Sequence, residues 1–372
     1  MNGKNDLSEE SDSDLDEMAR VGSDSSVNIV VEQGSMNLYS GEFGEVKRLY
    51  IGKQSGTNPG YVLLDARKKI DMGDWKEVVR FVKYAKKNFP AEKYMLVIWN
   101  HGTGWVEEKG KAIEGTAPPS AETLNRGISY DDETHNDITV PEMRAMLKAI
   151  GGIDLLAADA CLMADIAVSA EISGYAPYVV ASQEIEPPGG YDYSLLLKSI
   201  TDNPGMDGRE AALATLSMFA RTYSFAWADA TTSVVDSARL SKFIDDVRIF
   251  VQKAVATSDK PALAEAYFKA QRFYDRTAAD FYDFLKIASE RTSDAGLKAH
   301  MVHMMAEISG SVVIGNAAFD KHDSRAHGIS VYMPPAEYSS DYDKLLFGKY
   351  TGWGRFVELM LKNKPAEKTF FN

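Results

Sequence analysis

The chain has 372 residues, a length that corresponds to two or three domains of about 150 residues, or to one large domain with an addition. Apolar residues make up 45% of it and charged residues 26%, so it can bury a core. The 41 basic and 54 acidic residues give a formal net charge of −13, which argues against binding nucleic acid or anionic lipid by charge and favours cationic partners. The single cysteine, Cys161, excludes an intrachain disulfide and a multi-cysteine zinc site. No run of about 18 apolar residues predicts a membrane span.

The first hundred residues predict one helix, two strands, a second helix and a third strand. Residues 7–20 form an acidic segment with sparse apolar points, which indicates a short helix. The β-branched run Val27–Val31 and the segment Val46–Ile51 predict strands. Residues 72–88 place apolar side chains at helical spacing and end in basic residues, as a helix does. The continuous apolar run Tyr94–Trp99 is typical of a strand buried on both faces.

A long loop and three further elements follow. Residues 102–126 are rich in Gly, Pro, Thr and Glu, and a loop of this length is often functional. A capping box in Thr139–Glu142 begins a helix that reaches Ile150. Strands are predicted at Ile153–Ala158 and Tyr178–Ser182, with a helix over Met163–Ile172 between them. This alternation predicts an α/β fold with a largely parallel sheet covered by helices on both faces.

The remainder of the chain is predicted to be mainly helical. We expect helices over residues 208–222, 238–257, 260–274 and 294–308, and strands at Ser311–Gly315 and Ile329–Met333. The change in pattern suggests an α/β domain over residues 1–240 and a mainly helical part over residues 241–372, whose strands could return to the sheet.

Two of the predicted buried strands each end beside a residue capable of chemistry. The run YMLVIW leads into His101 and Gly102, and the run IDLLAADA leads into Cys161. Carboxyl ends of neighbouring parallel strands lie at one edge of a sheet, so His101 and Cys161 could meet there. A thiol beside an imidazole is the arrangement that nucleophilic catalysis needs. The backbone N–H groups of Gly102 and Cys161 would then stabilise an oxyanion. The plainer alternative is that Cys161 is a small buried apolar residue.

The segments around these residues resemble the clostripain family of cysteine peptidases, which have the caspase-like fold of clan CD. The similar segments span roughly residues 14–193 and are DLDEMARVGS, VNIVV, YMLVIWNHGTGW, GISYDDETHNDITVPEMRAML, DLLAADACLMADIAVSAEI and YVVASQEIEPPGGYDY. The joint presence of WNHGTGW and DACLM is specific, whereas the last third is similar only in pieces such as HGISVYMPP. The resemblance implies a caspase-like α/β/α sandwich, with residues 1–240 as the catalytic domain.

The resemblance also implies an activity and roles for individual residues. It implies hydrolysis of peptide bonds through a thioester, with Cys161 as nucleophile and His101 as general base and acid, and no required cofactor. Asp159 matches the family's aspartate in the pocket for the residue before the scissile bond, which implies peptide or protein substrates with Arg or Lys there. An aspartate two residues before Cys161 on a strand shares its face, and a carboxylate pairs well with a cation. The alternative is an Asp159 that caps a helix or binds loop amides.

Members of the family often cut themselves in the loop after the histidine. This chain has Lys109, Lys111 and Arg126 in the 103–126 loop. We therefore expect that Cys161 cleaves there, after Lys109 or Lys111 in particular, to leave two chains from one precursor. The alternative is a flexible loop that is not cut.

Two further sets of acidic residues are candidates for the site. Asp131, Asp132 and Asp137 suggest calcium, which some family members use, although the segment lacks the glycine of an EF-hand and a solvated turn would explain it. Glu184, with Glu186, follows another strand end and could bind substrate at the rim of the cleft or lie on the loop surface.

The chain departs from the family pattern at its beginning. Members carry an apolar strand before the segment that matches residues 5–20, whereas this sequence starts at Met1 and shows no signal peptide. We expect a longer native chain with that strand, and the resemblance to an often exported family leaves the compartment open. Without the strand, a neighbouring strand would present an unpaired edge.

Two other functions agree with the same residues. One is a catalytically silent relative that binds basic peptides through Asp159. The other is a different thiol hydrolase, such as an amidase or transpeptidase, that uses the same His101 and Cys161.

Overall fold

A five-stranded sheet forms the centre of the computed structural model, which describes residues 1–105, 127–225, 229–274, 276–322 and 324–366. Its strands run in the order β12 (Val313–Ala318), β10 (Thr231–Asp236), β9 (Tyr178–Ala181), β8 (Leu155–Asp159) and β5 (Met95–Trp99). Neighbouring strands are parallel from β5 to β9 and antiparallel from β9 to β12. The sheet is therefore largely parallel, as predicted: β12 runs in the same direction as β9, β8 and β5, and β10 runs against them.

The apolar composition of β5 and β8 matches their position between the two layers of helices. Both strands pack helices on each side, so nearly every side chain is apolar. Their pairing is in a regular parallel register, with Leu96 opposite Leu156 and Ile98 opposite Ala158. The two strands consequently end side by side.

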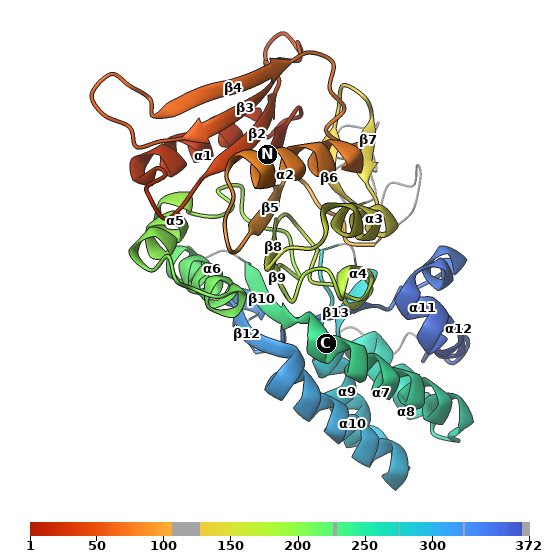
Figure 1. Cartoon of the computed structure of the whole chain (residues 1–372). Helices are drawn as coiled ribbons and strands as arrows, with labels where there is room; N and C mark the ends of the chain where they lie inside the picture. The colour runs from red at the N-terminus through yellow and green to blue at the C-terminus, as the bar shows by residue number, and fades with distance from the viewer. Residues whose placement is uncertain (106–126, 226–228, 275, 323, 367–372) are drawn as a thin grey trace.

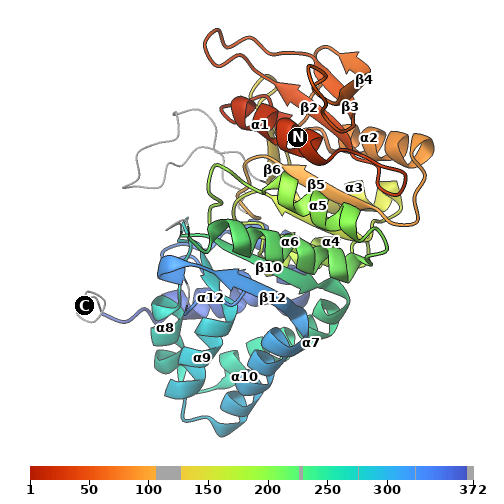
Figure 2. The same cartoon turned by 90° about the vertical axis from the view of Figure 1, so that its left-hand side faces the viewer.

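Helices cover both faces of this sheet, which confirms the α/β/α sandwich (Figure 1). One face packs against α2 (Trp75–Asn88), α3 (Val140–Ile150), α4 (Ile166–Ile172) and α7 (Ser237–Ala256). The other face packs against α1 (Ser8–Val21), α5 (Tyr193–Asp202) and α6 (Gly208–Tyr223). Figure 2 shows α5 and α6 in front of the sheet. The predicted capping box of α3 is present, with Thr139 and Glu142 bonded reciprocally.

A second sheet lies at the N-terminal end of the molecule. Its four strands run in the order β1 (Asn2–Gly3), β2 (Val30–Ser35), β3 (Val46–Ile51) and β4 (Tyr61–Arg67). Strand β1 pairs in parallel with β2, and the others pair antiparallel. The small ribbon of β6 (Ile128–Asp131) and β7 (Asn136–Ile138) lies beside β1 and β5.

The C-terminal half packs mainly as helices at the opposite end from this sheet (Figure 1). Its further elements are α8 (Lys260–Lys269), β11 (Ala278–Asp280), α9 (Phe281–Arg291), α10 (Ala295–Glu307), β13 (Ser330–Tyr332), α11 (Leu346–Thr351) and α12 (Trp353–Lys362), with a π-helical turn at Ile308–Val312 and 3-10 turns at Asp320–His322 and Ser340–Lys344. Buried rings dominate the packing, with Phe250 5.3 Å from Phe356 and Trp353 4.9 Å from Phe356 between ring centroids. One apolar core joins these helices to the sheet.

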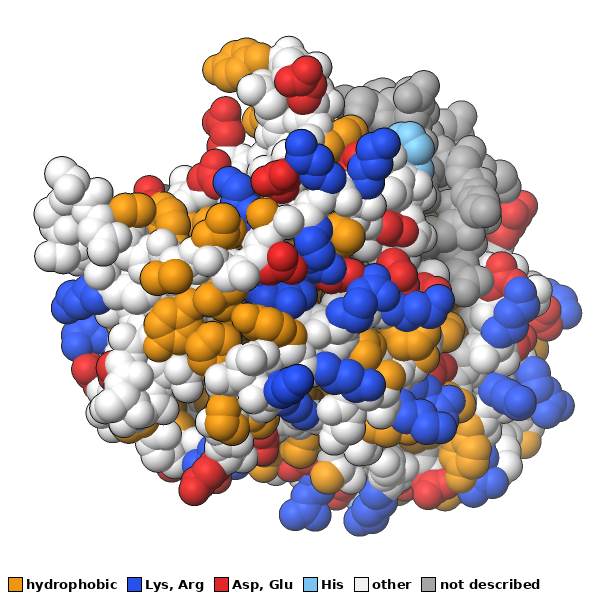
Figure 3. All heavy atoms as spheres, turned by 45° about the horizontal axis from the view of Figure 1, so that its top comes forward, with side chains coloured by type: hydrophobic (Ala, Val, Ile, Leu, Met, Phe, Trp, Pro, Cys, Tyr) orange, Lys and Arg blue, Asp and Glu red, His pale blue; other side chains and the backbone are white. Residues whose placement is uncertain are grey.

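A hollow of about 320 Å³ lies between β5, the edge strand of the central sheet, and residues 30–32 of β2, a part of that strand that β1 does not pair. Apolar side chains such as Val31, Leu96 and Leu196 line it. The Met1 amino group also borders it and donates a hydrogen bond to the Glu32 carbonyl oxygen at 2.8 Å. Burial lowers the pKa of this amino group to about 6. Figure 3 shows hydrophobic side chains gathered on the face that carries the N-terminal sheet. An upstream strand stays a prediction that this hollow could accommodate.

Candidate active site

The ends of β5 and β8 bring the two predicted catalytic residues to one edge of the sheet. Trp99 lies opposite Asp159 as the last paired residues, and the Asn100 N–H donates to the Asp159 carbonyl oxygen at 3.3 Å. His101 and Cys161 therefore follow directly from adjacent parallel strands. The sequence pattern of two apolar runs was sufficient to predict this neighbourhood.

Gly102 lies against the backbone of the nucleophile candidate. A Cβ atom added at Gly102 would come within 2.5 Å of the Cys161 carbonyl oxygen, so only glycine fits without a shift of the backbone. The bridge between Gly102 and Ile128 is made by the Thr103 N–H and the His101 carbonyl, and it does not use the Gly102 N–H. The Gly102 N–H is therefore not engaged in this bridge.

The residue after Cys161 has an unusual backbone conformation. Leu162 has a φ of 62°, in the left-handed region that leucine rarely adopts. Its N–H donates to the Glu184 carbonyl oxygen at 3.1 Å, and its side chain packs with Phe273 and Ala326. These contacts hold a sharp turn immediately beyond the thiol.

The Cys161 thiol is partly buried and accepts a hydrogen bond from the Glu186 N–H, with 3.2 Å between nitrogen and sulfur. Burial raises the pKa of the thiol, and the charges of Glu184 and Asp159 raise it further. The sulfur is accordingly a thiol at neutral pH, and attack on a carbonyl requires a base to take its proton.

The His101 ring contacts two groups that the sequence did not indicate. Its Nε2 atom lies 2.8 Å from Oδ1 of Asp6, and its ring stacks on Tyr130 with 6.1 Å between centroids. Asp6 lies between β1 and α1, 95 residues earlier in the chain. Nothing in the polar segment around Asp6 distinguishes it from its acidic neighbours, so no sequence signal could have found it.

Asp159 is buried beneath the loop that follows β9. Its Oδ2 atom accepts hydrogen bonds from the Tyr193 hydroxyl at 2.8 Å and the Tyr191 N–H at 3.3 Å. Gly190 approaches so closely that a Cβ there would lie 2.8 Å from Asp159 Oδ1. Burial raises the pKa of Asp159 and, to a greater extent, that of the neighbouring Glu186, whose proximity to Asp159 adds repulsion. The two carboxyl groups consequently disfavour being ionised at the same time.

Helix α1 adds two more carboxyl groups to this acidic region. Burial, together with the charges of Asp159 and Glu17, raises the pKa of Asp14 to about 8. Glu17 accepts a hydrogen bond from the Tyr193 N–H at 2.9 Å. The sequence gave no reason to connect α1 with Asp159, because their contact depends on tertiary packing.

Glu184 is buried rather than free at the rim. Its Oε2 atom lies 2.9 Å from Nε2 of His322, and its Oε1 atom accepts from the N–H groups of Ile185 and Tyr274. The Glu184 side chain thus stabilises the loop after β9, from which the Glu186 N–H donates to the Cys161 sulfur. We interpret Glu184 as a support of this loop, and its predicted contact with substrate stays a prediction.

A hollow of about 630 Å³ opens beside this loop. It is lined by Glu184, Ile185, Glu186, Pro187, Pro188, Asp229, Gln271, Arg272, Phe273, Tyr274, Arg276 and Lys321. Of these residues, Glu186 reaches the thiol through its N–H, whereas Cys161, His101 and Asp159 do not line the hollow.

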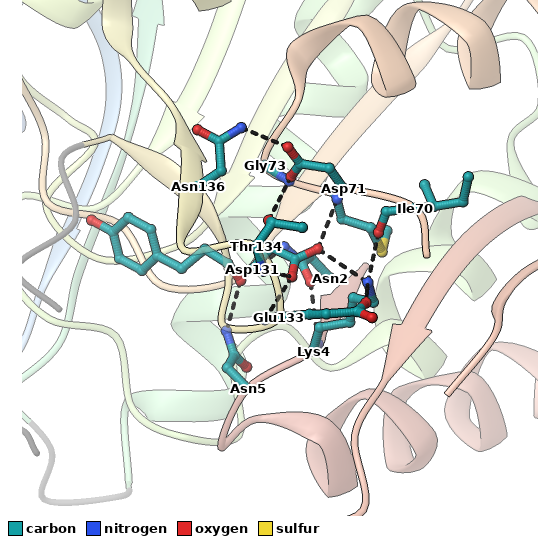
Figure 4. Close-up of polar contacts among 12 residues, drawn as sticks. Asn2, Lys4, Asn5, Ile70, Asp71, Gly73, Asp131, Glu133, Thr134 and Asn136 are labelled. Carbon is teal, nitrogen blue, oxygen red and sulfur yellow. Dashed lines mark hydrogen bonds and ion pairs between the residues drawn. The ribbon is translucent and has the colours of Figure 1, made fainter. Parts of the chain in front are cut away.

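The predicted calcium residues have other partners in this structure. Asp131 forms an ion pair with the buried Lys4 ammonium at 3.3 Å and accepts hydrogen bonds from the N–H groups of Met72, Glu133 and Thr134 (Figure 4). Across the part of the chain that the structure describes, no group of three or more His, Cys, Asp or Glu side chains is arranged to hold a metal. The calcium role of Asp131, Asp132 and Asp137 is untested, and Lys4 already supplies a cation to Asp131.

The predicted self-cleavage residues Lys109, Lys111 and Arg126 lie outside the described residues. Among the helices that are described, none is long and apolar enough to cross a membrane.

Comparison with known proteins assigns the family. The model of the clostripain family, peptidase family C11, matches residues 1–359. The chain belongs to this family of cysteine peptidases. Clostripain from Hathewaya histolytica is 30% identical over 151 residues, which are 38% of this chain and 27% of that protein. The match therefore spans about a quarter of the length of the curated relative.

Solved structures support the same fold. A secreted C11 cysteine protease from Bacteroides thetaiotaomicron, in complex with an irreversible peptide inhibitor, is 17% identical, with a TM-score of 0.67 over 94% of this chain and 96% of that chain. An inactive zymogen of a C11 protease from Parabacteroides distasonis is 16% identical, with a TM-score of 0.68 over 94% and 95%. At these identities the likeness concerns the fold, which is the caspase-like fold of the family.

Proposed function

We propose that this chain is a cysteine endopeptidase in which Cys161 is the nucleophile and His101 the general base and acid. The observation that supports this most directly is the pairing of β5 with β8, from whose adjacent ends His101 and Cys161 follow. Membership of a family of cysteine peptidases agrees with it. The raised pKa of the thiol requires a base, and His101 is the imidazole at the same edge.

The reaction would proceed in two steps. His101 takes the thiol proton while Cys161 Sγ forms a bond to the carbonyl carbon, and the C–N bond then breaks as the imidazolium gives its proton to the leaving amine. Water, deprotonated by His101, next attacks the thioester and releases the carboxylic acid and the thiol. The N–H groups of Gly102 and Cys161 would stabilise the negative oxygen in both steps.

Asp159 and Glu186 would bind a basic side chain before the scissile bond. Two buried carboxyl groups that disfavour double ionisation gain most from a cation, and a guanidinium binds carboxylate in a bidentate manner. Substrates with Arg or Lys at that position are therefore expected. Replacing Asp159 by Asn should lower kcat/KM for such substrates about a hundredfold and change turnover of neutral ones much less.

Turnover of a fluorogenic peptide with Arg before the reporter group tests the peptidase function. Replacement of Cys161 by Ala, or of His101 by Ala, should reduce kcat at least about a thousandfold. Labelling by an Arg-directed electrophile should occur at Cys161 and exceed labelling by a neutral one. Binding of basic peptides without turnover would instead support the silent relative. Transfer to an added amine acceptor would support a transpeptidase.

We also propose self-processing in the 103–126 loop, after Lys109, Lys111 or Arg126. The related protein from Parabacteroides distasonis is described as an inactive zymogen. Intact mass spectrometry of the wild type should show two chains whose masses sum to the precursor plus one water. The Cys161→Ala variant should stay whole, and a wild-type chain that also stays whole, differing from the variant only by the mass of the substitution, would exclude the proposal.

A further inference from the structure

Asp6 is the carboxylate in hydrogen-bond contact with the His101 ring. The 2.8 Å contact joins Asp6 Oδ1 to Nε2, and the His101 ring holds the pKa of Asp6 below its ordinary value, mainly through this hydrogen bond. Asp132 also lies near the ring. Burial raises the pKa of Asp132, and the charge of Asp6 raises it further. Of these two carboxyl groups, Asp6 is therefore the better partner for a positive imidazole ring.

The side chain of Asp6 is 76% exposed, so its position depends on how its backbone is held. Asn2 and Asn5, which both precede Asp6, donate from their side-chain amides to the Tyr130 carbonyl oxygen, at 2.8 Å and 3.1 Å. Asn100 donates from its side chain to the Asn2 carbonyl and accepts from the Tyr130 N–H. The segment before Asp6 is thus tied to the same residues that flank His101.

Lys4 holds the same segment through a second set of contacts (Figure 4). Its ammonium is fully buried, donates to the Ile70 carbonyl oxygen at 2.6 Å and pairs with Asp131 and Glu133. Its carbonyl oxygen accepts from the Asp132 N–H at 3.1 Å. Because two separate parts of the chain, Ile70 and the turn of residues 131–133, hold Lys4, the backbone of Asp6 has a defined place.

We propose that Asp6 is the positioning residue of His101. Its carboxylate accepts the Nε2 proton, which leaves the unprotonated Nδ1 atom as the ring nitrogen that exchanges a proton with the Cys161 thiol. The same carboxylate stabilises the imidazolium that forms when the thiol proton moves to the ring. The inference rests on the proposed peptidase function, and it adds a third member to the pair of His101 and Cys161.

Three variants at Asp6 separate orientation from charge. Asp6→Ala removes both, Asp6→Asn keeps an acceptor without charge, and Asp6→Glu keeps the charge on a longer side chain. We expect kcat to fall about a hundredfold in Asp6→Ala and about tenfold in Asp6→Asn, within the range of general acid–base effects. KM should change less than twofold, and Asp6→Glu should recover part of kcat. The matched control is Glu9→Ala, an exposed carboxylate of the following helix.

The tautomer of His101 provides a readout that does not need activity. Nitrogen NMR of the imidazole in Cys161→Ala protein should show the proton on Nε2, and the additional Asp6→Ala change should shift the population toward Nδ1. An unchanged tautomer, or unchanged kcat in Asp6→Ala, would overturn the inference. Absence of peptide turnover in the wild type would instead count against the proposed function, and the tautomer measurement would still decide the role of Asp6.

Discussion

The central sheet is held differently on its two sides. Beyond β9, the C-terminal helices pack through rings that are fully buried, such as Phe250, Trp353 and Phe356. Beyond β5, the N-terminal sheet shares an apolar cluster with the central sheet and is attached in addition through ionised and polar groups such as Lys4 and Asn100. Apolar packing is insensitive to pH, whereas ion pairs and buried carboxyl groups are not. The two sides should therefore respond to different perturbations.

The largest loss of stability is expected from a change among the buried aromatic rings of the C-terminal helices. Phe250→Ala removes a fully buried ring and leaves a cavity, which should lower the free energy of unfolding by about 4 kcal/mol. Urea unfolding measures this loss. The adjacent Ile249 is 37% exposed, so Ile249→Ala is the matched control and should cost far less. Equal losses in the two variants would contradict the difference between the sides.

A smaller loss of stability is expected when the buried Lys4 ammonium is removed from the side of the N-terminal sheet. Lys4→Met leaves the Asp131 carboxylate buried without its cation, and should lower the free energy of unfolding by about 3 kcal/mol. Adding Asp131→Asn should restore part of that loss, because the uncompensated charge is gone. Lys47→Met, at an exposed position of β3, is the control. A wild-type stability for Lys4→Met would show that the pair contributes little.

The hollow between β2 and β5 allows a test by addition. An upstream extension of about six apolar residues, the usual length of a strand, should pair with an open edge there and raise Tm by a few degrees. A Gly/Ser extension of equal length is the control. The same Tm for both extended proteins and for the chain itself would count against the expected upstream strand.

The smallest effect concerns Asp14 and depends on pH. The carboxyl group loses its proton near 3.8 in the unfolded chain and near 8 in the folded one. Between these values the folded state binds more protons, so the free energy of unfolding falls as pH rises. Asp14→Asn should remove part of this slope, so the stability of the variant relative to the wild type should be greater at pH 8 than at pH 4. Parallel pH profiles for the two proteins would contradict the assignment.

The sequence was most informative where apolar runs end in glycine or cysteine. The strands around Leu96 and Leu156 are continuous apolar segments, and their order along the chain sufficed to predict that His101 and Cys161 share an edge. Asp6 and Asp14 could not be predicted, because their contacts depend on how a polar segment and a weakly apolar helix pack on the sheet.

Strand β10 was missed for a related reason. Its first half, Thr231–Ser233, is polar, yet it lies buried in the sheet, where the hydroxyl groups of Thr231 and Ser233 have partners inside the protein. Thr231 accepts from the N–H groups of Gln183 and Glu184, and Ser233 donates to the Gly328 carbonyl oxygen. A pattern of apolar residues cannot reveal a strand whose burial depends on such distant partners. The predicted boundary at residue 240 therefore falls just after a strand that joins both parts.

The left-handed backbone of Leu162 determines when the turn beside Cys161 can form during synthesis of the chain. Such a conformation costs about 1–2 kcal/mol for a residue other than glycine. Here the side chain packs with Phe273 and Ala326, which leave the ribosome more than a hundred residues after Cys161. A nascent chain that lacks them has nothing to hold the turn in place. The turn beyond Cys161 can therefore reach its final geometry only after Phe273 and Ala326 have been synthesised.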